Sequence, residues 1–111
     1  MNRPTRFYSD KQEKAVAKAL QGKQVSNSGA PKFCGGDVTT DDWLIECKTT
    51  TATIKQSFSI KKEWLDKNKE EAFAMNKCYN ALAFQFGEGQ PNYYIIDEKT
   101  FIKMKEALEN D

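Results

Sequence analysis

Two carboxylates and one amine, Asp37, Glu46 and Lys48, have the types and the spacing for metal-assisted chemistry on phosphate esters. Proteins bind Mg²⁺ through oxygen ligands, usually one or two carboxylates together with phosphate oxygens of the substrate. A cation held in this way activates water and stabilises charge on the phosphate, and a nearby ammonium group adds to that stabilisation. The three residues therefore indicate phosphodiester hydrolysis. The residue types alone leave a second interpretation equally open, in which surface acids lie beside a surface lysine on a solvated strand.

A hairpin is expected to bring the two carboxylates together. Good strand formers flank Asp41 and Asp42, whose side chains are typical of turns. With these two residues as the loop, Asp37 faces Glu46 across the two strands, where like charges repel unless a cation lies between them.

Strand alternation predicts the other side chains of the hairpin. Lys48 falls on the same face as Glu46. The opposite face is expected to be apolar and to carry Trp43, Ile45 and Cys47. The Cys47 thiol should therefore point into the core, where it is inert.

Gly36-Asp37, eight further residues and then Glu46-Cys47-Lys48 resembles the signature of the PD-(D/E)XK nuclease superfamily, which has the restriction-endonuclease-like fold. The preceding Ser26-Asn27-Ser28-Gly29-Ala30 is similar to a loop of the archaeal-type Holliday junction resolvases and their phage-encoded relatives. The resemblance covers about residues 10 to 60. It departs from the signature at Gly36, where proline is usual.

The resemblance implies a metal-dependent endodeoxyribonuclease with Mg²⁺, or Mn²⁺, as cofactor. Asp37 and Glu46 would bind the metal, the Cys47 carbonyl would be a further ligand, and Lys48 would assist the attacking water. Glu13 has two interpretations. It is either a third acid, the role of a helix glutamate in the resembled resolvases, or the partner of Asp10 in a capping box.

Periodicity and turn residues predict the order α-β-β-β-α-β-β-α, an α/β fold with a mixed central sheet flanked by helices. This order contains the αβββαβ core that the resemblance implies. After a basic arm over residues 1–8, the expected elements are a helix from Ser9 or Asp10 to Gln21, a short extended piece at 24–26, the hairpin at 33–48, a strand at 53–59, a helix at 60–76, strands at 79–86 and 93–96, and a last helix, for packing, capped by Asp97.

Length and composition narrow the classes of protein. A chain of 111 residues is expected to be one domain, here a nuclease domain over residues 1–111. The absence of histidine excludes His-based zinc sites and Ser-His triads. The three cysteines lack CxxC spacing, and no apolar stretch approaches the length of a membrane span. These features predict an intracellular, cytoplasmic protein. The resemblance to phage resolvases extends this expectation to a phage-encoded protein.

The charge distribution predicts a nucleic-acid partner. Residues 1–40 hold seven Lys or Arg and three Asp or Glu, whereas residues 63–111 hold six and ten. A polyanion would thus meet the first part of the chain. The expected DNA contacts, which read the backbone of branched DNA, are Arg3, Arg6, Ser28, Lys32 and Lys55.

A resolvase needs two nicks, which favours a homodimer. Aromatic side chains in the late strands either supply that interface or belong to the core: Phe84, Phe86, Tyr93 and Tyr94. The alternatives to a resolvase are a general, nicking or restriction-type endonuclease of the same fold and a non-catalytic DNA-binding module. The presence of all three motif residues argues against the last.

Overall fold

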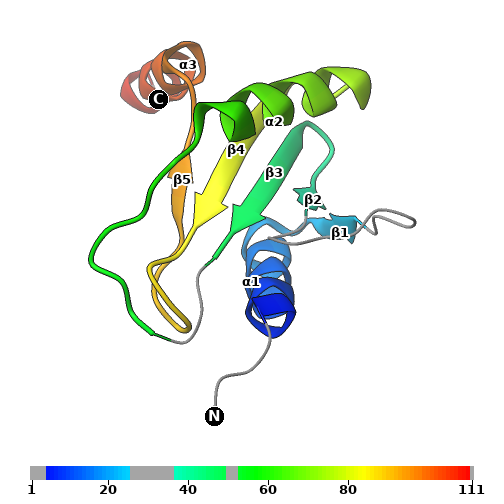
Figure 1. Ribbon diagram of the computed structural model, residues 1–111. Coiled ribbons are helices and arrows are strands. Elements are labelled where there is room, and N and C mark those ends of the chain that lie inside the picture. Colours follow the sequence, from blue (N-terminus) through cyan, green and yellow to red (C-terminus); the bar gives the residue numbers. More distant parts are fainter. Residues whose placement is uncertain (1–4, 26–36, 50–52, 111) are drawn as a thin grey trace.

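A five-stranded mixed sheet with strand order β1-β2-β3-β4-β5 forms the centre of the protein (Figure 1). The computed structural model describes residues 5–25, 37–49 and 53–110, without the side chains of residues 5 and 6. Over these residues the chain is a compact α/β domain with three helices. In chain order the elements are α1 (Thr5–Leu20), β1 (Lys23–Val25), β2 (Asp37–Thr39), β3 (Trp43–Lys48), α2 (Lys62–Ala74), β4 (Tyr79–Phe84), β5 (Tyr93–Ile95) and α3 (Glu98–Glu109).

Strand β2 pairs antiparallel with both β1 and β3. Strands β3 and β4 pair in parallel, and β5 pairs antiparallel with β4. A parallel pair needs a crossover connection, and α2 lies within it. The predicted α/β class and the element order α-β-β-β-α-β-β-α are confirmed, although one strand differs from the prediction.

The hydrophobic core lies between α1 and one face of the sheet. Val16 of α1 packs there with alternate residues of the inner strands: Val38, Ile45, Cys47, Ala81 and Ala83. The predicted inward orientation of the Cys47 thiol is confirmed, because this residue has no exposed surface. The period of two along β3 places Cys47 on the same face as Ile45, and residues on both faces of this strand are buried.

The helix α1 begins at Thr5, earlier than predicted, so the basic arm does not extend over residues 5–8. Tyr8 and Gln12 are buried and continue the inward stripe of Val16 back by two turns, a pattern that the polar Ser9 and Gln12 hid. Asp10 lies inside the helix and pairs with Lys14 at 3.1 Å. The capping-box interpretation of Asp10 and Glu13 is therefore wrong.

The helix α1 ends at Leu20, one residue before the predicted Gln21, and the left-handed residue after it is Gln21, with φ of 56°. Gly22 follows and donates its N–H to the carbonyl of Ala17 at 2.8 Å. A Cβ atom at this position would stand 2.5 Å from the carbonyl oxygen of Thr39. A side chain larger than that of glycine would therefore collide with β2 at the point where the chain turns from α1 into β1.

The predicted strand at 53–59 is wrong, because the described residues 53–61 contain no strand. The third strand is instead β1, at the short extended piece predicted around Val25. Both edges of β4 are already paired, to β3 and β5, so the segment finds no free edge there. The backbone N–H of Lys55 donates to the carbonyl of Phe86, two residues after β4 ends, and Ile54 is half exposed.

The last helix, α3, is capped as predicted but is hardly packed. Asp97 accepts a hydrogen bond from the backbone N–H of Thr100 at 2.8 Å. Most of its apolar stripe nevertheless faces outward, with Phe101 58% and Leu108 78% exposed, and only Met104 of the stripe lines a pocket beside the sheet. The interpretation of α3 as a packing element is therefore wrong. Within the described ranges, no helix is both long and apolar enough to cross a membrane.

Candidate metal centre

The hairpin of β2 and β3 has the predicted register, with Asp37 directly opposite Glu46. Asp41 and Asp42 form the connection between the strands. The backbone N–H of Thr40 donates to the Trp43 carbonyl at 3.1 Å, and the Thr40 hydroxyl accepts from the Trp43 N–H at 3.1 Å. These bonds fix the turn, and the turn fixes which side chains face each other.

The connection from α2 to β4 braces this turn from the neighbouring strand. The Lys77 ammonium donates to the carbonyl oxygens of Thr40 and Asp41 at 2.7 and 3.2 Å. The backbone N–H of Tyr79 donates to the carbonyl of Asp42 at 2.9 Å. Residues that follow α2 in the sequence therefore hold the hairpin turn in place.

A third carboxylate, Glu71 of α2, joins the pair on the hairpin. Oxygen atoms of Asp37, Glu46 and Glu71 lie within 4.8 Å of one another. Glu46 is buried and the other two are half-buried. Sequence reasoning missed Glu71, although it falls at i+3 from the buried Asn68 and i+7 from Trp64 on the inward side of α2.

The Lys48 ammonium lies beside the cluster, on the predicted face. Its Nζ is 3.0 Å from Oε2 of Glu46, and the two side chains are only 7% and 11% exposed. The Trp64 ring covers the same ammonium, with 4.3 Å between Nζ and the ring centroid. A charge this deeply buried is tolerated only with such partners.

These residues suit a hard divalent cation. All three candidate ligands are carboxylates, and oxygen donors of this type select Mg²⁺, Mn²⁺ or Ca²⁺ over softer metals. Three carboxylates this close repel one another, and the Lys48 ammonium offsets only part of their negative charge. The arrangement can therefore attract a cation and, through it, a phosphate.

Glu13 is not part of the group of three. Its Oε1 accepts a weak hydrogen bond from Gln24 of β1 at 3.4 Å, and the side chain is almost fully buried. In the described residues, the third carboxylate of the cluster thus comes from α2, and a role of Glu13 at the metal stays a prediction.

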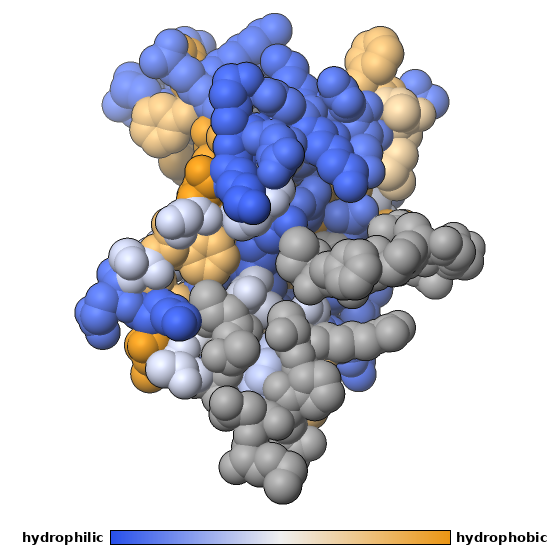
Figure 2. All heavy atoms as spheres, in the orientation of Figure 1, coloured by the Kyte–Doolittle hydropathy of each residue, from blue (hydrophilic) through white to orange (hydrophobic). Residues whose placement is uncertain are grey.

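Most of the predicted DNA contacts cannot be placed. Arg3, Ser28 and Lys32 lie outside the described residues, as does the side chain of Arg6. Lys55 is exposed in the segment between β3 and α2. On the face drawn in Figure 2, hydrophilic side chains cover much of the upper part of the molecule, where Figure 1 places α2.

The aromatic residues of the late strands fall on two faces of the sheet. Phe84 lies beside Lys48 in the β3–β4 register and contacts Phe58, Phe86 and Tyr93. Tyr94 points the other way, opposite Ala83 of the core. The four aromatic residues considered for a dimer surface therefore do not form one continuous patch.

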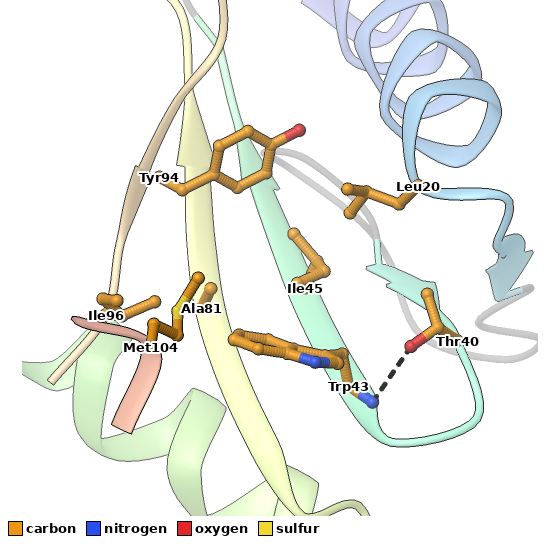
Figure 3. A pocket seen from close by; sticks show the side chains of 8 residues that line it. All are labelled: Leu20, Thr40, Trp43, Ile45, Ala81, Tyr94, Ile96 and Met104. Atoms are coloured by element: carbon orange, nitrogen blue, oxygen red, sulfur yellow. Dashed lines mark hydrogen bonds between the residues drawn. The ribbon is translucent and has the colours of Figure 1, made fainter. Parts of the chain in front are cut away.

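The face of Tyr94 carries an apolar pocket of about 490 Å³ (Figure 3). Side chains from the end of α1, the hairpin, β4, the end of β5 and α3 converge on it: Leu20, Thr40, Trp43, Ile45, Ala81, Tyr94, Ile96 and Met104. Partial burial, and then the electrostatic effect of the neighbouring Cys47, raise the pKa of the Tyr94 phenol above its usual value. None of the eight lining side chains is that of Asp, Glu, Lys or Arg.

Comparison of the chain with protein-family models, with curated proteins and with solved structures gave no match.

Proposed function

We propose that this protein is a divalent-metal-dependent DNA endonuclease with a restriction-endonuclease-like fold, related to the archaeal-type and phage Holliday junction resolvases. The observation that carries the proposal is the pairing of Asp37 with Glu46 and the position of Lys48, 3.0 Å from Glu46 on the same face. The succession α1-β1-β2-β3-α2-β4 supports the same reading, since it has the element order of that fold's core.

The residues have distinct roles in phosphodiester hydrolysis. Asp37, Glu46 and Glu71 would hold the cation, with the Cys47 carbonyl as a further candidate ligand. When bound, a divalent cation supplies positive charge beside the scissile phosphate and makes water a stronger nucleophile. Lys48 adds its own positive charge where the phosphate oxygens become more negative. Burial of the Glu46–Lys48 pair strengthens both effects, because less water screens them.

The proposed substrate is branched DNA, cut by a homodimer. One site cuts one strand, so resolution of a four-way junction requires two sites related by symmetry. Contacts to phosphates, from the basic first part of the chain, read backbone shape and make affinity fall steeply with salt.

The test is incubation with labelled duplex, nicked, flap, single-stranded and four-way-junction DNA, with and without Mg²⁺. Wild-type protein should cut only with the metal, and Asp37→Asn should cut none of the substrates. Asp66→Asn is the matched control, because Asp66 is an exposed acid on α2 that pairs with Lys62 away from the cluster. Light scattering measures the oligomeric state alongside.

Different outcomes remove different parts of the proposal. Full cleavage by Asp37→Asn would remove the metal-site assignment. Equal cleavage of junction and linear duplex by a monomer would leave a general or nicking endonuclease. Binding of DNA without any cleavage in Mg²⁺ or Mn²⁺ would leave a non-catalytic DNA-binding module.

A further inference from the structure

Among the contacts of the Lys48 ammonium are two of different kinds, one with a carboxylate and one with an indole ring. Glu46 lies 3.0 Å from Nζ, and the centroid of the Trp64 ring lies 4.3 Å from the same atom. Trp64 stands in the first turn of α2, the helix that also carries Glu71. One helix thus approaches both the amine and the acids of the candidate site.

The two partners respond differently to a divalent cation. A cation bound between Asp37 and Glu46 competes with Lys48 for Glu46, because two positive charges on one carboxylate repel each other. The attraction of an ammonium to an aromatic face needs no counter-charge, and it strengthens where water is excluded. Trp64 is therefore a partner that Lys48 keeps when it gives up part of its contact with Glu46.

We propose that Trp64 is the positioning residue for Lys48: its ring holds the ammonium beside the acid cluster while a divalent cation displaces it from Glu46. The consequence for cleavage rests on the proposed function, whereas the displacement itself does not. Trp64 acts through Lys48 and need not touch the substrate.

A second lysine supplies a matched control. The Lys61 ammonium lies 5.8 Å from the same ring centroid, but Lys61 is exposed and forms the N-cap position of α2. Replacing either lysine by methionine removes one ammonium near the ring. Only Lys48 also contacts the acid cluster.

The first experiment is a titration of tryptophan fluorescence with Mg²⁺ and with Ca²⁺. It uses a Trp43→Phe background, because the fluorescence of Trp43, which lies on the other face of β3, would otherwise overlap that of Trp64. Trp64 emission should change saturably in this background and with Lys61→Met. It should not change with Lys48→Met or Asp37→Asn. If Trp64 emission does not change on addition of either cation, or changes equally with Lys48→Met, the proposal is overturned.

The second experiment compares Trp64→Leu with Trp64→Phe in single-turnover and steady-state cleavage. The leucine variant should lose about tenfold in kcat, with KM for DNA within about twofold, and phenylalanine should restore most of the loss because it keeps an aromatic face. Melting temperatures of both variants identify any loss of folded protein. Equal kcat in the two folded variants would overturn the role of the ring.

The two experiments separate this inference from the proposed function. If wild-type protein cuts no DNA, the nuclease proposal fails and the fluorescence titration still decides whether Lys48 moves against Trp64. If wild-type protein cuts with Mg²⁺ and Trp64→Leu equals Trp64→Phe, the nuclease proposal stands and the inference fails.

Discussion

The two faces of strand β3 differ in almost every physical respect, although they come from alternate residues of one short strand. Ile45 and Cys47 pack against α1 in an apolar core, and the same face continues into an uncharged pocket. Glu46 and Lys48 face the other way, toward α2, where a carboxylate cluster and a buried ion pair lie. Both faces exclude water, but the α2 face combines the paired charges with buried apolar residues, Leu44 and Leu82.

This contrast separates stability from chemistry along the chain. Burial of apolar side chains on the α1 face stabilises the fold, whereas a cluster of carboxylates on the α2 face opposes it. Residues on opposite faces of the β2–β3 hairpin should therefore give opposite results when they are replaced, and the following predictions test that contrast.

The largest effect is expected at Asp37 on the α2 face. Asp37→Asn should reduce cleavage by about a thousandfold or more, because a metal ion contributes several kcal/mol of transition-state stabilisation. The stability of the metal-free protein should be equal or higher, since one of three clustered charges is gone. Single-turnover cleavage and urea unfolding measure the two quantities. A large loss of stability would show that Asp37 is mainly structural.

The reverse result is expected at Ile45 on the α1 face. Ile45→Ala should lower the free energy of unfolding by about 2–5 kcal/mol, because the residue is 2% exposed and its loss leaves a cavity. Cleavage per folded molecule should stay close to that of wild type at a temperature where the variant is folded. Calorimetry and an activity assay under the same conditions check both. A variant that is stable but inactive would contradict the separation of the faces.

Metal binding should stabilise the protein through all three acids. At about one hundred times its dissociation constant, Mg²⁺ should add about 2.7 kcal/mol to the stability of the wild type. Glu71→Gln should reduce this gain, and Asp66→Asn should not, because only Glu71 belongs to the cluster. Melting temperatures with and without Mg²⁺ supply the test. An unchanged gain in Glu71→Gln would remove Glu71 from the proposed metal site.

The smallest predicted effect lies at the cap of α3, outside both faces. Hydrogen bonding by the Thr100 side chain, and then by its backbone N–H, holds the pKa of Asp97 below its usual value. The stabilisation from the charged cap is present above about pH 4 and is lost as the pH falls through the folded-state pKa. Asp97→Asn should therefore weaken the dependence of stability on pH below about pH 4. Urea unfolding at several acid pH values measures it, and an unchanged dependence would assign it to other carboxylates.

The sequence allowed the hairpin and its two faces to be predicted because both follow from local rules. Asp41 and Asp42 specified the loop, and the loop with strand alternation specified the partners of Asp37 and Lys48. Glu71 was missed because its place in the cluster depends on how α2 docks on the sheet, which a local pattern does not contain. The same limit explains the error at 53–59, where strand-forming residues lie near β4, a strand that is already paired on both sides.

The parallel pairing of β3 with β4 has a consequence for the order of folding. The Asp37–Glu46 hairpin can close early, since its contacts are local, but α2 reaches the sheet only with the long-range closure that brings β4 beside β3. The third carboxylate is therefore expected to join the pair after the hairpin has closed. A divalent cation at this cluster would slow unfolding and leave the folding rate nearly unchanged, because it would stabilise the native state and not the folding transition state.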